Sequence, residues 1–313
     1  DRVTGNRNFI TKIWSANNFL KLNNCKLDKK INIKFIKLPI NQWIFNEYIK
    51  AQNLVSENID IFRFDEAAKH VYQFVWHLYC DWYLEFLKPI FNSKNKLEIK
   101  EAKIFSSFMM ANILRLLHPF IPFFTESIWA TNKYKSTFKD YLISSSWPNY
   151  KKSTKFKKNQ NDINDVIELI TSIRTTKAEL KITPKLFCNI SFPDKASKLR
   201  NLINDNINLI QQVGRVKGII EKKQKTENSV EILVLKEKLS LSFSEDINLA
   251  SQKERIIQKL DNLKKQIDRL NNKLENKAYL KNAPKEIVQN DKKLVKELTI
   301  EDDKLRSIVS SIN

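Results

Sequence analysis

Residues 64–88 read FDEAAKHVYQFVWHLYCDWYLEFLK and indicate how the first half of the chain folds. Apolar side chains recur in this run at intervals of three and four residues, which is the spacing of one face of an α-helix. They are Phe64, Ala68, Val71, Val75, Leu78 and Trp82. Pro89 follows directly and predicts the end of the helix, because proline lacks the N–H that continues the hydrogen-bond ladder. A helix with one apolar stripe needs other helices to cover that stripe.

Neighbouring segments show the same pattern. Residues 5–20, 39–55 and 98–117 are amphipathic with helical spacing, and a shorter helix is expected from Thr125. Long helices that are joined by modest loops and apolar on one side each pack as a bundle. We therefore expect an antiparallel helical bundle over residues 1–149.

The composition changes after the bundle. Lysines crowd residues 150–161, which predicts a basic linker. Residues 162–250 then indicate a helix followed by a small α+β module. Three short segments have the apolar pattern of strands, namely residues 186–192, 230–235 and 239–243, with a helix at about 195–212 between the first two.

Residues 251–313 contain the most regular pattern of the chain. Apolar residues step by four and three, which is the heptad repeat of a coiled coil. They are Ile256, Leu260, Leu263, Ile267, Leu270 and Leu274. Ala283-Pro284 interrupts the pattern, and a second seam follows at heptad-compatible positions: Ile287, Leu294, Leu298, Leu305, Ile308 and Ile312. Two seams joined by a short break favour an intramolecular antiparallel hairpin, since in a parallel dimer the break would lie in the middle of the rod.

The predicted fold is therefore mainly α: an antiparallel helical bundle, a small α+β module and a C-terminal antiparallel coiled-coil hairpin. Lys and Arg number 55 against 35 Asp and Glu, so the net charge is +20. Such a surplus favours a polyanionic partner, first nucleic acid and then an acidic membrane. Heavy use of Lys, Asn and Ile also fits an AT-rich genome, so the charge alone does not decide.

Several function classes are disfavoured. With only three glycines, the chain has neither a dinucleotide-binding fingerprint nor a phosphate-binding P-loop. Its three cysteines are far apart and indicate a reducing compartment rather than a disulfide framework. No apolar run is long enough to span a membrane.

The sequence offers few candidates for chemistry. His77 and Cys80 lie at i and i+3 of one helix, but two mixed ligands without a third make a poor metal site. Asp81 and Glu85 are one helical turn apart, and a salt-bridged bundle helix is the favoured interpretation. No nucleophile motif is present. We expect no catalytic residue and no metal ligand in this chain.

Two basic regions suit nucleic acid. Lysines and arginines recur along the hairpin surface, and such a rod could contact phosphates without reading sequence. The alternative is an ordinary solvated coiled-coil surface. The N-terminal helix mixes cations, amides and an aromatic, which are the side chains that bind single-stranded RNA loops. The alternative there, which its composition favours, is simply an amphipathic helix start.

Four motifs resemble class I aminoacyl-tRNA synthetases. Gly5-x-Arg7-Asn8-Phe9-x-x-Lys12-x-Trp14 resembles the start of their anticodon-binding bundle. The block from Ala67 to Glu85 is similar to the valyl enzymes, and residues 116–129 match the next signature. Residues 251–313 resemble the coiled-coil arm of valyl-tRNA synthetases. The resemblance covers essentially the whole chain.

This resemblance implies that the chain is the C-terminal part of a bacterial-type valyl-tRNA synthetase. It implies binding of tRNA(Val) during ATP-dependent aminoacylation with valine, as a monomer in the cytoplasm with no membrane contact. Valine, ATP and Mg²⁺ would act in a catalytic domain that is missing here, as is an editing domain. The chain by itself is expected to hold no cofactor and to be inactive.

The resemblance also suggests individual roles. On the anticodon side, Arg7 would hold phosphate, Asn8 and Asn17 would read base edges, and Phe19 would stack on a base. On the elbow side, the phosphate contacts would be Lys264, Lys265, Arg269 and Lys277.

Two other functions remain open at this point. The coiled coil could be a structural or protein-interaction module whose charge is incidental. A self-standing enzyme is the second possibility, but it would need a convergent polar site that the sequence does not offer.

Overall fold

The computed structural model describes residues 2–28, 31–132, 141–151, 157–192, 198–220, 229–243, 249–276, 279 and 285–312. The chain divides into two compact units, Asp1–Ile167 and Glu168–Asn313. The division falls inside the helix that spans Lys157–Glu179. No described helix is long and apolar enough to cross a membrane.

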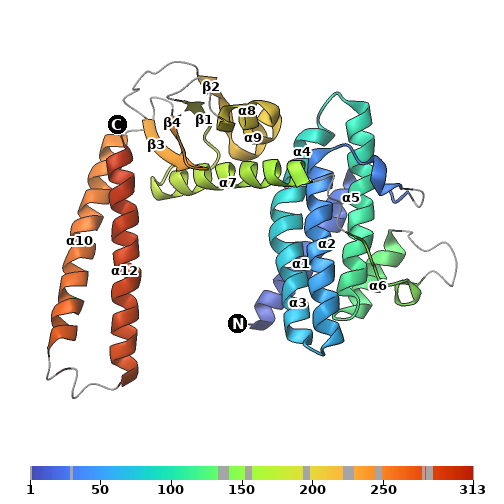
Figure 1. Ribbon diagram of the computed structural model, residues 1–313, viewed down its shortest axis with the longest axis horizontal. Coiled ribbons are helices and arrows are strands. Elements are labelled where there is room, and N and C mark those ends of the chain that lie inside the picture. The colour runs from blue at the N-terminus through green and yellow to red at the C-terminus, as the bar shows by residue number, and fades with distance from the viewer. Residues whose placement is uncertain are drawn as a thin grey trace. The chain divides into compact units, whose positions relative to one another are not determined.

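The first unit is the predicted helical bundle. Its helices are α1 (Arg2–Leu22), α2 (Pro39–Asp60), α3 (Phe64–Gln73), the π-helix η2 (Phe74–Tyr83), α4 (Leu84–Phe91), α5 (Lys96–Leu117) and α6 (Pro122–Thr131). Short 3₁₀ turns lie at Ile33–Phe35 and Leu142–Ser144. Helices α1, α2, α3 and α5 lie side by side (Figure 1), so that each buries its apolar stripe against its neighbours.

Local signals in the sequence define several helix ends. Pro39 begins α2, where its missing N–H costs nothing. The Asn95 side chain caps α5 by accepting hydrogen bonds from the N–H groups of Leu97 and Glu98, at 3.2 and 3.3 Å. Pro89 does not end its helix as predicted, because it lies inside α4, which continues to Phe91.

The π-helix is the main departure from the predicted bundle. At its end, the N–H of Leu84 bonds to the carbonyl of Tyr79, five residues back, instead of the usual four. Because the turn is wider, every fourth residue lies on the buried face. That face consists of Ala67, Val71, Val75, Tyr79, Tyr83 and Leu87. The predicted stripe is therefore wrong at Phe64, which is exposed, and at Leu78 and Trp82, which are only half-buried.

The core of the bundle is rich in aromatic rings. Trp43, Tyr48, Phe86 and Phe105 are fully buried. The hydroxyl of Tyr83 is satisfied inside this core, because it donates to Asn41 Oδ1 at 2.8 Å. Rings of this size supply much of the apolar area that a bundle buries.

The second unit begins with the rest of α7 (Lys157–Glu179), which starts within the range expected to be a linker. The α+β module follows with β1 (Cys188–Ser191), α8 (Lys198–Asp205), α9 (Ile207–Gly214), β2 (Val216–Ile220), β3 (Ser229–Val234) and β4 (Glu237–Ser242). The strand order is β2-β1-β4-β3, with β1 and β2 parallel and the other pairs antiparallel. The sequence prediction missed β2 and expected a single helix where α8 and α9 lie.

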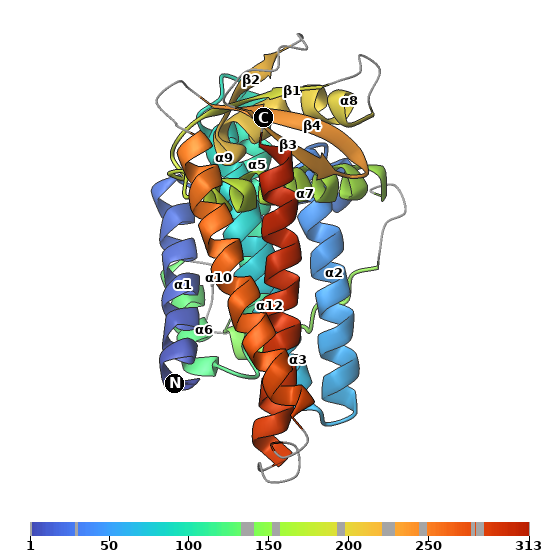
Figure 2. The same cartoon turned by 90° about the vertical axis from the view of Figure 1, so that its left-hand side faces the viewer.

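The coiled-coil hairpin consists of α10 (Leu249–Glu275) and α12 (Lys285–Ser311), which run alongside each other (Figure 2). The predicted seam of α10 is confirmed where Ile256, Leu260 and Leu263 are buried. Ile312, just after α12, forms an isolated β-bridge with Val230 and so ties the foot of the hairpin to β3.

The seam of α12 agrees with the prediction at Leu298, Leu305 and Ile312 and differs by one residue at Ile287 and Leu294. Ile287 and Leu294 are 46% and 42% exposed, so they do not line it. The less exposed face consists of Val288, Asp291, Val295, Leu298, Asp302, Leu305, Val309 and Ile312. Both registers obey heptad spacing and share Leu298, Leu305 and Ile312. The side chain of Ile308 lies outside the described residues.

Candidate nucleic-acid interface

The outward face of α1 contains the first candidate contacts. Arg7, Asn8, Thr11 and Ser15 are exposed along it. Trp14 is exposed as well. Cations, amides, hydroxyls and an indole on one helix face are side chains that can bind phosphate, base edges and base faces.

The structure separates the four residues that the sequence grouped on the anticodon side. Asn17 is only 1% exposed, and its Oδ1 accepts a hydrogen bond of 2.7 Å from Asn132 Nδ2. The ring of Phe19 is half-buried and stacks on Phe91, with centroids 5.9 Å apart. Burial therefore removes Asn17 from base reading, and only Arg7 and Asn8 present free surface.

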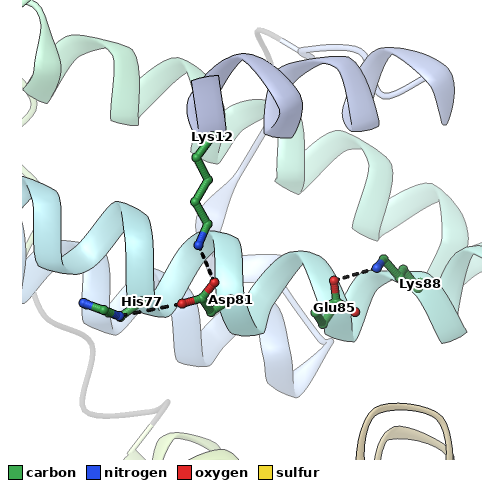
Figure 3. A network of polar contacts seen from close by, with 5 residues as sticks. All are labelled: Lys12, His77, Asp81, Glu85 and Lys88. Carbon is green, nitrogen blue, oxygen red and sulfur yellow. Dashed lines mark hydrogen bonds and ion pairs between the residues drawn. The ribbon is translucent and has the colours of Figure 1, made fainter. Parts of the chain in front are cut away.

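A polar cluster on the π-helix holds α1 in place (Figure 3). Lys12 Nζ lies 2.5 Å from Asp81 Oδ1 and 3.9 Å from the centroid of the Trp76 ring. His77 Nδ1 approaches the other carboxylate oxygen of Asp81 at 3.6 Å. Glu85 pairs with Lys88 at 2.6 Å, one turn further along. Both carboxylates are ion-paired, as predicted for a salt-bridged bundle helix; Asp81 joins η2 to α1, whereas Glu85 and Lys88 both lie on α4.

Aromatic rings complete this attachment. The Phe9 ring of α1 lies 4.8 Å from the centroid of Tyr72 and 6.3 Å from that of Trp76. Partly buried cation–π and aromatic contacts contribute about 1 kcal/mol each. They fix the rotation of α1 about its axis, and this rotation decides that Arg7 and Asn8 face outward.

The same region lacks the properties of a reactive site. Burial raises the pKa of the Cys80 thiol to about 12, so the thiol stays protonated and is a poor nucleophile and metal ligand. In the part of the chain that the structure describes, no group of three or more His, Cys, Asp or Glu side chains could hold a metal ion.

The second candidate surface lies on α10. Lys264, Lys265 and Arg269 are exposed on this helix and lie outside its seam. Among the described residues, none of the three forms an ion pair, whereas Lys259 on the same helix pairs with Glu301 at 2.5 Å. Unpaired cations on a rigid rod keep their full charge for an external anion. Lys277, the fourth predicted contact, lies outside the described residues.

Near its far end the hairpin is braced by a cluster that sequence reasoning missed. Asp291 Oδ2 accepts hydrogen bonds from the Tyr279 hydroxyl at 2.7 Å and from Lys273 Nζ at 2.9 Å. Lys273 Nζ also lies 4.6 Å from the centroid of the Tyr279 ring. The bond from Lys273, followed by that from Tyr279, lowers the pKa of Asp291. The sequence feature that could have indicated this cluster is Asp291, an acidic residue at a heptad position.

Comparison with known families matches both units. A family model described as the anticodon-binding domain of tRNA ligase matches residues 41–192. A second, described as the valyl tRNA synthetase tRNA binding arm, matches residues 248–313 and so contains the hairpin.

Curated relatives give a consistent result. A valine–tRNA ligase of Pelagibacter ubique is 34% identical over 294 residues, which are 93% of this chain and 33% of that protein. Valine–tRNA ligases of Brucella suis biovar 1 and Mesorhizobium japonicum are each 30% identical, over 95% and 97% of this chain and 32% and 33% of their own lengths. The chain thus spans about a third of the length of the curated relatives it matches.

Proposed function

We propose, from the premise that the chain belongs to the valyl-tRNA synthetase family, that it binds tRNA(Val) and holds it in position for aminoacylation with valine. The observation that supports this best is the row of exposed cations on α10, Lys264, Lys265 and Arg269, which have no ion-pair partner among the described residues. Such cations bind phosphates and release counterions from the nucleic acid.

We assign the two surfaces to two parts of the tRNA. The bundle contacts the anticodon stem and loop, where Arg7 holds phosphate and Asn8 reads a base edge. The α10 cations contact the elbow. Asn17 and Phe19 support the bundle instead, because Asn17 is buried with its Oδ1 bonded to Asn132 and the Phe19 ring stacks on Phe91.

The residues present do not fit ATP or Mg²⁺. The sequence has three glycines and no phosphate-binding loop, and the described residues offer no carboxylate cluster for a metal. We therefore assign valine activation, with its ATP and Mg²⁺, to the catalytic domain of a full-length synthetase. We also propose that the protein is a monomer, because α10 and α12 cover each other's seam. A location in the cytoplasm is proposed from the family relationship.

A titration with tRNA(Val) at low and moderate salt tests the proposal. Reversing the charges in Lys264→Glu/Lys265→Glu/Arg269→Glu should weaken binding by at least about tenfold, since phosphate contacts dominate such affinities. The matched control, Lys292→Glu/Lys293→Glu/Lys296→Glu, makes the same change in charge on exposed positions of α12. This control variant should bind tRNA(Val) much more tightly than the α10 variant does.

Two outcomes would contradict the assignment. Equal losses in both triple variants would mean that general charge, and not the α10 surface, attracts the tRNA. Unchanged affinity in both would favour the alternative, a protein-interaction module whose charge is incidental. A parallel titration with a non-cognate tRNA measures how much discrimination this chain provides by itself.

A further inference from the structure

An aromatic ring and three cations lie on the surface of the α+β module, outside both regions discussed above. Phe187 precedes β1 and is 46% exposed, and Arg215 precedes β2 and is exposed as well. The two strands are parallel neighbours with Cys188 opposite Val216. The guanidinium carbon of Arg215 lies 5.6 Å from the centroid of the Phe187 ring.

Two exposed lysines flank this pair. Lys185 is two residues before Phe187, and Lys217 is two residues after Arg215. Among the described residues, none of the three cations forms an ion pair. We call Lys185, Phe187, Arg215 and Lys217 the module patch. Its charge is +3 from these side chains alone, with an aromatic face at its centre.

The backbone at Arg215 is unusual. Its φ is 55°, a left-handed conformation that glycine or asparagine normally adopts at the end of a helix. The nearby glycine is one residue too early to serve. Gly214 is buried, and a Cβ there would meet Ile170 Cγ1 at 3.4 Å. The disfavoured left-handed conformation therefore falls on Arg215, a residue with a long cationic side chain.

A buried lysine holds the two halves of the patch together. Lys177 is only 2% exposed, and its Nζ donates to the carbonyl of Leu186 at 2.8 Å. It also contacts the carbonyls of Gly214 at 3.5 Å and Arg215 at 3.4 Å. The Leu186 carbonyl adjoins Phe187, and the carbonyls of Gly214 and Arg215 belong to the turn that carries Arg215. Burying a cation is costly unless its hydrogen bonds are satisfied, so this arrangement fixes the two segments side by side.

We propose that the module patch is a further RNA contact, at which an unpaired base of the bound tRNA stacks on the Phe187–Arg215 pair while Arg215, Lys185 and Lys217 hold the adjoining phosphates. Aromatic rings with nearby cations bind single-stranded RNA in this way, since every base has a stackable face. An acidic protein segment would use the cations but would leave the ring without a role. The inference rests on the proposed function, because tRNA is taken as the ligand.

Substitutions that separate stacking from folding test the patch. In the whole chain, Phe187→Leu keeps an apolar side chain but loses the ring, and Arg215→Asn keeps a residue that tolerates the left-handed backbone. Each should weaken tRNA(Val) binding about tenfold, in the range that base–aromatic stacking provides. Phe187→Tyr should retain the affinity of the unmodified chain. Leu233→Ala and Lys238→Gln, at exposed positions of β3 and β4, are the matched controls and should change it less than about twofold.

The possible failures are distinguishable. If the unmodified chain binds tRNA(Val) and both patch variants bind equally well, the patch inference is overturned and the proposed function stands. If the unmodified chain does not bind tRNA(Val) even at low salt, the proposed function fails and the inference fails with it. Thermal unfolding of each variant shows whether Arg215→Asn perturbs the fold. If it does, the comparison of Phe187→Leu with Phe187→Tyr decides.

Discussion

Cys80 lies on the π-helix between Tyr79 and Asp81, and burial shapes its chemistry more than its neighbours do. Desolvation is the largest cause of its raised pKa of about 12, while the nearby cation of Lys12 acts in the opposite direction. Burial likewise raises the pKa of Tyr48 and Tyr83 in the same bundle. The core of the bundle thus holds acidic groups that must remain protonated.

These groups predict loss of stability at alkaline pH. The Cys80 thiol has an ordinary pKa of 9.0 but one of about 12 in the folded chain, so the unfolded chain releases its proton first as the pH rises. The free energy of unfolding should fall from pH 9 upward, by about 2 kcal/mol at a pH of about 10.5 from Cys80 alone. Denaturant unfolding at several pH values measures this loss.

A variant isolates the contribution of Cys80. Cys80→Ala removes the titrating thiol, so the decline between pH 8 and 10.5 should become shallower by that amount. The lowered pKa of Lys177, which desolvation causes, acts in the opposite sense and is common to both proteins. An equally steep decline in the variant would show that Cys80 does not titrate as its burial implies.

At the scale of elements, the π-helix and the α12 seam illustrate the same problem. Each contains apolar residues that fit more than one helical face. In η2, the wider turn exchanges Leu78 and Trp82 for Tyr79 and Tyr83 on the buried side. In α12, packing against α10 selects the register that turns Ile287 and Leu294 outward. Periodicity identifies each helix but leaves its rotation uncertain by about one residue.

The register of α12 can be tested at Leu294, which lines the seam only in the register expected from sequence, with Leu305, which lines it in both registers, as the reference. Leu305 is 7% exposed. Leu305→Ala should lower the free energy of unfolding by about 2 to 3 kcal/mol, because apolar burial is lost and a cavity is left. Leu294→Ala, on the exposed side, should cost less than about 1 kcal/mol. Denaturant unfolding followed by circular dichroism at the helical band gives both values. A larger loss at Leu294 would restore the register expected from sequence.

At the scale of the whole molecule, the net charge of +20 is spread over both units and is not confined to the arm. If the chain binds tRNA through phosphates, the logarithm of its affinity should fall linearly with the logarithm of salt concentration. The expected slope is about −0.7 to −0.9 for each phosphate neutralised. Between 50 and 200 mM salt, about six contacts would reduce the affinity roughly a thousandfold.

The triple charge reversal on α10 should make this slope shallower by about 2 to 3, since it removes three contacts. Affinity measured at four or five salt concentrations gives the slope for each protein. A slope near zero for the unmodified chain would contradict phosphate binding and favour a protein partner.

Local periodicity, turn residues and motifs were enough to predict the helical bundle, the basic hairpin, the family and most strands. The favoured interpretation of Asp81 and Glu85, a salt-bridged bundle helix, is confirmed by their ion pairs with Lys12 and Lys88. Of the site residues proposed on the anticodon side, Arg7 and Asn8 lie on the surface that the proposal needs.

Which face of each helix is covered depends on contacts with other segments of the chain and could not be predicted from local patterns. Asn17 is buried because Asn132, more than a hundred residues away, lies against it. The α12 seam depends on α10, and the module patch exists because Lys177 joins two strands that are distant in sequence. Such outcomes depend on contacts between remote segments, and a local pattern does not contain them.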